Sequence, residues 1–362
     1  MMIEEDVRSD LAIPPGEYLE EVLFELGMTK DELARRMSRP ATKFSAVYTG
    51  DKAITSETAL QLEKVVGVPA HIWSELESEY RLTLARNQQA RDAEKLRDER
   101  GLVAKFCYSE LVKLGYAARQ SKAVEKVREL QSFFGVTSLK NIPTLKRYQA
   151  AFRQGKGRRS PEATAAWLRI GELAGQKATL PPFNKKGLQK ALLDIRKLTR
   201  LSPEEFEPRL HEILSGVGVE FVLCPHLPKT YLHGAVFWLG KNKAVLMLTI
   251  RGSWADVFWF SLFHEIGHLL LHNKQTVFLE GDRQDQEFET AEHEADRFAA
   301  DTLISSDAYK SFVDTKAFYP QDIKTFASRL EIDPGIVVGR LQHDRCIKNA
   351  WHNDLRKRYK WK

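Results

Sequence analysis

Phe263-His264-Glu265-Ile266-Gly267-His268 lies inside an apolar segment that runs from about Ser253 to His272. Two histidines four residues apart share one face of a helix, so both imidazoles reach a single Zn²⁺, and Glu265 between them is placed to take a proton from a bound water. The neighbouring positions are apolar: Val257, Phe258, Phe260, Leu262, Ile266, Leu269 and Leu270. Burying two histidines and a glutamate without a partner is costly, so the pattern predicts a buried helix with a metal site rather than a structural histidine pair.

A catalytic zinc needs a third protein ligand and an open position for water. The next predicted helix covers about 285–303 and has an apolar stripe at Ala291, Ala295, Phe298, Ala299 and Thr302. Helical geometry places Glu292 and Glu294 on opposite margins of that stripe, whereas His293 points the other way. His272, one turn beyond His268, is a further contender. The residues alone leave Glu292, Glu294 and His272 open as the third ligand.

The hydrophobic period changes just before the apolar helix. Short runs rich in Val, Phe, Trp and Leu at 217–223, 235–239 and 244–250 predict strands, and Gly240-Lys241-Asn242-Lys243 between the last two is a hairpin signal. After the two helices, a closing helical pair contains Asp333-Pro334-Gly335, with Asp as cap and Pro at the first helical position. We therefore expect a mainly α fold with a small β-sheet (α+β), its sheet lying in the C-terminal part.

The N-terminal region predicts a compact helical bundle. Apolar residues three or four apart define helices at 17–26, 29–37, 41–48 and 56–66. The second and third of these have the layout of a helix-turn-helix, whose outward residues would face a major groove and its phosphates. The candidate DNA contacts are Arg39, Lys43, Ser45, Thr49 and Lys52. Ordinary packing of two helices gives the same spacing, so the pattern leaves both readings open.

Charge is unevenly distributed along the 362 residues, whose net value is +6. Residues 101–200 contain 21 Lys and Arg against 6 Asp and Glu, whereas residues 1–100 contain 14 against 20. The basic middle is mostly helical, with an exposed loop expected at 154–159. Such a block suits nucleic acid or an acidic surface, and the alternative is a solvated face without a partner.

Composition and cysteine usage restrict the class of protein. With 43% hydrophobic and 29% charged residues, the chain is an ordinary globular protein of two or three domains. Cys107, Cys224 and Cys346 are more than 100 residues apart, so we expect idle or buried thiols rather than disulfides or a cysteine metal site. No apolar run approaches the length of a membrane helix, and the first ten residues do not read as a signal peptide. We therefore expect a cytoplasmic protein without membrane contact.

The N-terminal residues resemble a known family of DNA-binding regulators. Residues 14–83 look like the HigA-type antitoxin branch of the Cro/C1 (XRE) helix-turn-helix family. The motifs that carry this resemblance are Pro15-Gly16-Glu17-Tyr18-Leu19, Leu33-Ala34-Arg35-Arg36-Met37, Ile54-Thr55-Ser56-Glu57-Thr58-Ala59-Leu60-Gln61-Leu62 and Ile72-Trp73-Ser74-Glu75-Leu76-Glu77. The resemblance implies a homodimer on operator DNA and a small ribonuclease toxin as partner. Pro40 and Ala41 depart from it, because polar residues are common in that turn.

The metal-site region resembles the ImmA/IrrE family of zinc metallo-endopeptidases. Its pattern is a His-Glu-x-x-His helix followed about 25 residues later by Glu-Ala-Asn-x-Phe-Ala, and this chain has Glu294-Ala295-Asp296-Arg297-Phe298-Ala299. The resemblance implies one Zn²⁺ per chain, held by His264, His268 and Glu294, with Glu265 as the catalytic base. Asp296 stands where asparagine is usual. We expect Asp296, and His272, to support the ligands through hydrogen bonds.

Two longer motifs connect the resemblances. Phe258-Trp259-Phe260-Ser261-Leu262-Phe263 and Asp333-Pro334-Gly335-Ile336-Val337-Val338-Gly339-Arg340-Leu341-Gln342 are similar to long HigA-like regulators fused to an ImmA/IrrE domain. We expect a helix-turn-helix domain at 1–83, a charged linker at 84–100, a basic helical region at 101–215 and a zinc metallopeptidase domain at 216–362.

Three functions compete at this point. The first is an antitoxin-type transcriptional regulator whose zinc domain senses or cleaves a protein partner. The second is an active endopeptidase that cleaves a repressor and uses the helix-turn-helix for docking. The third is an interaction protein with a structural metal, and Glu265 argues against it because a structural site has no need of a base. His226, Tyr231, His233 and His343 are further polar residues near the predicted domain, and we expect packing or surface roles for them.

Overall fold

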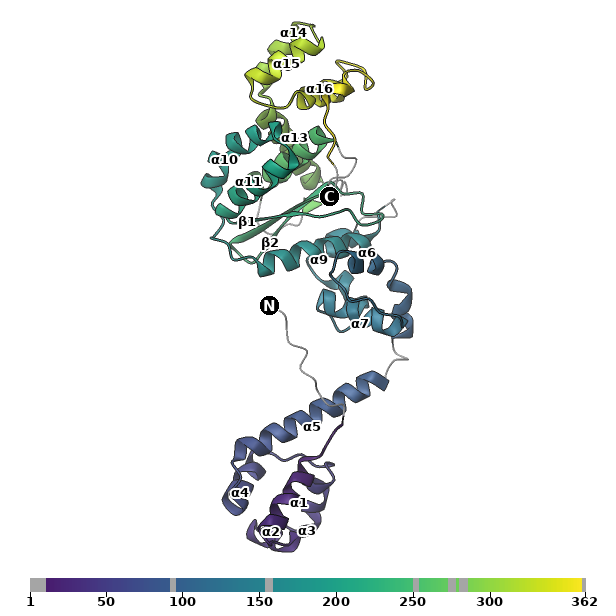
Figure 1. Cartoon of the computed structure of the whole chain (residues 1–362), viewed down its shortest axis with the longest axis vertical. Helices are drawn as coiled ribbons and strands as arrows, with labels where there is room; N and C mark the ends of the chain where they lie inside the picture. Colours follow the sequence, from purple (N-terminus) through teal and green to yellow (C-terminus); the bar gives the residue numbers. More distant parts are fainter. Residues whose placement is uncertain are drawn as a thin grey trace. The chain divides into compact units, whose positions relative to one another are not determined.

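A computed structural model describes residues 11–91, 96–153, 159–249, 254–272, 278–279 and 286–359 (Figure 1). The chain forms two compact units, residues 1–98 and 99–362. The predicted regions 101–215 and 216–362 fall within the second unit. The fold is mainly helical with one small sheet, so the predicted fold class is confirmed. Most of the predicted loop at 154–159 lies outside the described residues. Among the described helices, none has the length and apolar character needed to cross a membrane.

The first unit contains the five helices α1 (Pro15–Glu25), α2 (Lys30–Arg36), α3 (Ala41–Tyr48), α4 (Ser56–Val66) and α5 (Ala70–Arg91). Local capping sets their ends. The Thr29 hydroxyl accepts from the amide of Glu32 at the start of α2, Thr55 caps α4 in the same way, and Gly67 ends α4 in the left-handed conformation. Their common core is Leu19, Leu33, Phe44, Leu62 and Trp73, all buried. The helix-turn-helix elements α2 and α3 therefore have the predicted positions.

The second unit begins with a group of helices, of which α9 packs against the sheet. They are η2 (Arg97–Leu102), α6 (Tyr108–Lys113), α7 (Ala123–Phe134), η3 (Leu139–Thr144), α8 (Gln149–Arg153) and α9 (Pro161–Lys177). Buried Glu99 ties this part together, since its carboxylate accepts from the Ser138 hydroxyl and the Leu139 amide, at 2.5 and 3.0 Å. The buried carboxylate thus joins η2 to η3 through satisfied hydrogen bonds.

The sheet has the strand order β1-β3-β2-β4. Its strands are β1 (Val219–Leu223), β2 (Gly234–Leu239), β3 (Lys243–Leu248) and β4 (Phe278–Leu279). The hairpin β2–β3 is antiparallel, as predicted, whereas β1 pairs parallel to β3. On one face, Leu246 and Leu248 join the main core. On the other face α9 lies so close that a Cβ on Gly171 would be 2.2 Å from Met247 Sδ.

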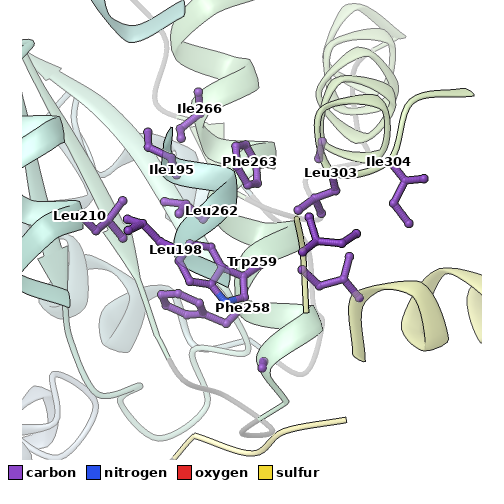
Figure 2. Close-up of a cluster of buried hydrophobic side chains, with 14 of the residues drawn as sticks. Ile195, Leu198, Leu210, Phe258, Trp259, Leu262, Phe263, Ile266, Leu303 and Ile304 are labelled. Carbon is purple, nitrogen blue, oxygen red and sulfur yellow. The ribbon is translucent and has the colours of Figure 1, made fainter. Parts of the chain in front are cut away.

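The main core lies between the sheet and the remaining helices. These are α10 (Lys185–Lys197), η4 (Leu198–Arg200), α11 (Pro203–Gly216), α12 (Ala255–Leu271) and α13 (Gln286–Leu303). Figure 2 shows Trp259, Leu262, Phe263 and Ile266 of α12 at the centre of the core. After α13 the chain forms three helices rather than the predicted pair, α14 (Ser306–Asp314), α15 (Pro320–Arg329) and α16 (Pro334–His343), and ends with η5 (Asn353–Leu355). Asp333 caps α16 as predicted.

Candidate metal centre

Three potential metal ligands meet where α12 and α13 pack together. His264 and His268 lie one turn apart on α12, and Glu292 lies on α13. The His264 and His268 Nε2 atoms are 3.0 Å apart. The two Glu292 carboxylate oxygens lie 3.6 Å from His264 Nε2 and 3.2 Å from His268 Nε2. Among the described His, Cys, Asp and Glu residues, these three form the group whose ligand atoms lie within 4.8 Å of one another.

Small residues allow the two helices to approach each other. A Cβ on Gly267 would lie 3.2 Å from the Cα of Ala295 and 3.1 Å from the ring of Phe298. The pairing of His264 with Asp296 and of His268 with Glu292 shows that the helices run antiparallel. Close antiparallel packing therefore carries the α13 carboxylates to the histidine face of α12.

Hydrogen bonds on the Nδ1 atoms orient both imidazoles. Asp296 Oδ1 lies 2.9 Å from His264 Nδ1, so once a metal displaces the second ring proton, His264 donates to Asp296 and offers the lone pair of its Nε2 to the metal. His272 Nε2 lies 3.1 Å from Glu294 Oε2, and His272 Nδ1 lies 2.9 Å from His268 Nδ1. If His272 donates to Glu294, His268 donates to His272 and again keeps a lone pair on Nε2. Both lone pairs then point at one spot beside Glu292.

Glu265 is buried next to the first residue of β2. Its side chain is 2% exposed, and a Cβ on Gly234 would lie 2.4 Å from Glu265 Oε1. Only a glycine at that position leaves room for the carboxylate as placed. The sequence alone did not identify Gly234. A glycine at the start of a strand gives no indication that a side chain from a distant helix, here Glu265, will pack against it.

The charges in the cluster favour a cation. Burial lowers the pKa of His264, but the Asp296 hydrogen bond and the nearby Glu265 and Glu292 carboxylates outweigh it and raise that pKa to about 9. Burial lowers the pKa of His268, and the neighbouring His264 lowers it further. Two buried imidazole nitrogens 3.0 Å apart need a proton or a cation between them. Two imidazoles and a carboxylate are a ligand set that suits zinc, so the residues fit such a metal.

The structure places the other predicted metal-site residues around this cluster. Asp296 and His272 contact the histidines as described above. Glu294, which the family resemblance nominated as third ligand, is not in the cluster. Its side chain is 56% exposed and contacts His272 instead. Glu292, which the helical periodicity had left open, occupies the position beside the two imidazoles.

The predicted DNA contacts differ in their surroundings. Ser45, Thr49 and Lys52 are exposed, whereas the side chain of Lys43 lies outside the described part of α3. Arg39 bonds to α4, with its guanidinium 3.1 Å from Thr58 Oγ1 and 3.3 Å from Glu57 Oε1. It therefore braces the turn between α2 and α3 against α4.

The fold and the site together define a class of protein: a helix-turn-helix unit joined to a unit with a metallopeptidase-type centre. Comparisons with known proteins agree with this class. Residues 255–342 match the family described as IrrE N-terminal-like domain, Peptidase M78. The HTH-type transcriptional regulator YddM of Escherichia coli (strain K12), itself uncharacterized, is 32% identical over 83 residues, which are 23% of this chain and 86% of YddM.

A solved structure, an addiction module antidote protein of a HigA family from Coxiella burnetii, is also similar. It is 33% identical over 23% of this chain and 92% of that chain, with a TM-score of 0.21. The chain belongs to the family of HTH-type regulators that YddM represents, and it carries an IrrE N-terminal-like domain in its C-terminal part.

Proposed function

We propose that the protein is a DNA-binding regulator whose C-terminal unit is a zinc metallo-endopeptidase acting on a protein partner. The observation that carries the peptidase part is the convergence of two buried imidazole Nε2 atoms and the Glu292 carboxylate, with Glu265 buried beside them. The partner class is a repressor or a toxin. The similarity to YddM, an HTH-type transcriptional regulator, supports DNA binding. The form that we propose for regulation is a homodimer on operator DNA.

His264, His268 and Glu292 would hold the metal, with their ligand atoms already within 4.8 Å of one another. When bound, the metal would supply Lewis acidity to a peptide carbonyl and a water. Asp296 holds the His264 ring with its Nε2 inward, and His272 does the same for His268. These contacts preorganise the ligands, so little side-chain entropy remains to be lost on binding.

Glu265 serves as the base in this proposal. Its side chain extends from α12 to the start of β2 and is buried there, where Gly234 leaves room for its carboxylate. In a water-poor site a carboxylate takes a proton from the attacking water and then delivers it to the leaving amine. The proton thus moves from water to the amine nitrogen through one side chain, and the peptide bond breaks without a covalent intermediate on the protein.

Metal analysis tests the ligand set. We expect the purified full-length protein to contain about one zinc per chain. Glu292→Ala should lose most of it, and Glu294→Ala, two residues away on the same helix, should retain most of it. Inductively coupled plasma mass spectrometry on the three proteins gives the answer. Loss of zinc from Glu294→Ala but not from Glu292→Ala would overturn the assignment.

Cleavage tests the mechanism. Zinc-loaded wild type, incubated with a pool of mixed-sequence decapeptides or with a co-expressed repressor, should generate new termini detected by mass spectrometry. Glu265→Gln should keep its zinc and its fold while losing at least about a hundredfold in rate, a typical loss for a removed general base. If Glu265→Gln cleaves as fast as wild type, Glu265 is not the base.

DNA binding has its own test. Lys43→Ala on α3 should weaken binding to a duplex from the promoter of the protein's own gene by about 5- to 100-fold at physiological salt, because it removes a groove or phosphate contact. Lys64→Ala, at an exposed position of α4, is the matched control and should bind as wild type does. Fluorescence anisotropy measures both. Unchanged affinity in Lys43→Ala would remove α3 from the interface.

A further inference from the structure

Buried Glu77 of α5 holds residues 50–54, the α3–α4 segment of the first unit. Its two carboxylate oxygens have separate partners: Oε2 accepts from the backbone amide of Ile54 at 2.9 Å, and Oε1 accepts from Arg81 Nε at 2.7 Å. Glu77 is 8% exposed and Ile54 is also buried, so the bond to the amide is shielded from water. α5, the longest helix of the first unit (Figure 1), therefore binds a backbone amide 23 residues earlier in the chain.

A second residue of α5, Tyr80, packs against the same segment. Gly50 has a φ of +75°, and a Cβ there would lie 2.5 Å from the Tyr80 hydroxyl oxygen. The left-handed backbone and the close aromatic ring both favour glycine at this position. At its other side the segment is bound to α3, because the Lys52 amide donates to the carbonyl of Ala46 at 2.8 Å. The backbone of the α3–α4 segment is thus held by α3 and by α5.

Lys52 is the positively charged residue of the α3–α4 segment. Its side chain is exposed, and within the described part of the chain its ammonium group forms no ion pair. The neighbouring Asp51 carboxylate accepts from the Thr49 hydroxyl instead, at 2.7 Å. An unpaired ammonium on a fixed backbone can meet a DNA phosphate without first losing a partner. A mobile segment would spread the ammonium over many positions and would lose that freedom on binding.

We propose that Glu77 is a positioning residue for DNA binding: through the Ile54 amide it fixes the α3–α4 segment so that Lys52 meets a phosphate of the duplex. The proposal rests on the proposed DNA binding and adds a determinant that lies outside α2 and α3. Without the contact between Lys52 and the phosphate, affinity should fall about 5-fold at physiological salt, and the slope of log affinity against log salt should fall by about 0.9.

Two conservative variants separate the length of the Glu77 side chain from its charge. Glu77→Asp keeps the charge but is one methylene shorter, so it should lose the bond to the Ile54 amide, weaken DNA binding about 5-fold and lower the salt slope by about 0.9. Glu77→Gln keeps the length and an oxygen that accepts from the amide, so its affinity should stay within about twofold of wild type. If the charge of Glu77 mattered instead, Glu77→Gln would bind DNA more tightly than wild type, and Glu77→Asp would bind as wild type does.

Fluorescence anisotropy measures affinities and salt slopes of the full-length proteins on a duplex from the promoter of the protein's own gene. Glu79→Asp, at an exposed position of the same helix, is the matched control and should give the wild-type affinity and slope. Amide hydrogen exchange reports the hydrogen bond directly. The Ile54 amide should exchange slowly in wild type, Glu77→Gln and Glu79→Asp, and faster in Glu77→Asp, because only that variant leaves the amide without its acceptor.

A double-mutant cycle tests whether Glu77 acts through Lys52. Lys52→Gln alone should show the same loss of about 5-fold and the same lower slope, and Glu77→Asp added to it should cause no further loss. Additive losses would overturn the proposal, because Glu77 would then support DNA binding by another route. Wild-type affinity and slope in Glu77→Asp would overturn it as well, while DNA binding itself stands. A wild-type protein that binds no duplex would remove the proposed DNA binding, and the role of Glu77 with it.

Discussion

Asp296 fixes the orientation of a candidate ligand, His264, from outside the ligand set, as His272 does for His268. Its carboxylate accepts from His264 Nδ1, which presents the opposite nitrogen to the metal. We expect Asp296→Ala to lower zinc affinity by about 10- to 100-fold. Asp296→Asn keeps a neutral hydrogen-bond acceptor, so its zinc affinity should lie between those of wild type and Asp296→Ala. Competition with a chromophoric chelator measures affinity, and Asp307→Ala on α14 is the control. Equal zinc affinities in Asp296→Ala and wild type would show that the contact between Asp296 and His264 does not contribute to metal binding.

The three cysteines differ in the reactivity expected from their burial. Burial raises the pKa of the Cys107 thiol to about 11 and that of Cys224 to about 12, so neither is a thiolate at neutral pH. Cys346 is only partly buried. We expect a thiol reagent at pH 8 to modify at most one cysteine quickly in the native protein and all three in urea. Cys346→Ser should remove the fast phase. A fast phase that persists would place a reactive thiol elsewhere.

The sequence was sufficient to find His264, Glu265 and His268, because their spacing alone puts them on one buried helix. It was not sufficient to choose the carboxylate. Glu292 and Glu294 lie on opposite margins of the same helix, and the choice depends on how α13 is rotated against α12, which is a tertiary property. One local signal was present: Glu292 and Asp296 are four apart, the spacing that lets one helix supply both a ligand and an acceptor for a histidine.

Helix packing at Gly267 links the fold to the metal cluster. A side chain there would meet the backbone of Ala295 on α13. Gly267→Val should destabilise the second unit by about 1–3 kcal/mol through overpacking and lower zinc affinity, since α13 carries Glu292. Gly216→Ala, where an added Cβ meets nothing within 4 Å, should be neutral or stabilising by up to about 1 kcal/mol. Urea unfolding and chelator competition measure both, and unchanged zinc affinity in Gly267→Val would uncouple packing from the site.

A largely buried ion network joins α9 to Arg147 and Tyr148, the two residues that precede α8. Glu172 accepts from the Tyr148 hydroxyl at 2.6 Å and from Arg169 at 2.7 Å, and Arg147 lies 3.0 Å from it. Burial alone would raise the pKa of Glu172, but these hydrogen bonds and the arginine charges lower it overall. A carboxyl whose folded pKa lies below its unfolded value of about 4.5 stabilises the fold above that pH, and the contribution disappears as pH falls through the folded pKa.

Glu172→Gln should therefore cost about 2 kcal/mol at pH 7, and the difference from wild type should shrink as pH falls below about 4.5. Urea midpoints at pH 7, 5, 4 and 3.5 test this. Glu331→Gln removes an exposed pair with Lys197 and should change stability by less than about 0.5 kcal/mol at every pH. A difference for Glu172→Gln that stays constant down to pH 3.5 would contradict the linkage.

The sequence predicted which segments are helices and strands better than it predicted which strands pair with one another. The β2–β3 hairpin carried its own turn signal at 240–243, and the caps at Thr29, Thr55 and Asp333 marked helix starts. The parallel contact of β1 with β3 joins strands separated by β2, which no local pattern encodes. After α13 the sequence indicated two helices where the structure has three of nine or ten residues each, because segments this short give little periodic signal to separate one from the next.

At the scale of the whole chain, the excess of basic residues between 101 and 200 has two parts. Arg147 and Arg169 are used inside the fold, in the network around Glu172. The remainder is on the surface: Lys113, Arg119 and Lys146 are exposed, whereas the acidic residues of 99–153 are buried or half-buried. This basic lobe, residues 99–153, therefore presents almost only positive charge to solvent.

A surface of this kind binds polyanions, and in a helix-turn-helix regulator the expected polyanion is the DNA backbone. In the full-length protein, replacing Lys113, Arg119 and Lys146 together by glutamine should reduce the slope of log affinity against log salt by up to about 3, because each lost phosphate contact removes about 0.9. The matched control replaces Lys185, Lys186 and Lys190, which are exposed on α10 outside the lobe. Anisotropy titrations on a 30-bp mixed-sequence duplex from 50 to 300 mM salt supply both slopes. If the two triple variants give the same slope of log affinity against log salt, the basic lobe makes no phosphate contacts of its own, and DNA binds elsewhere on the chain.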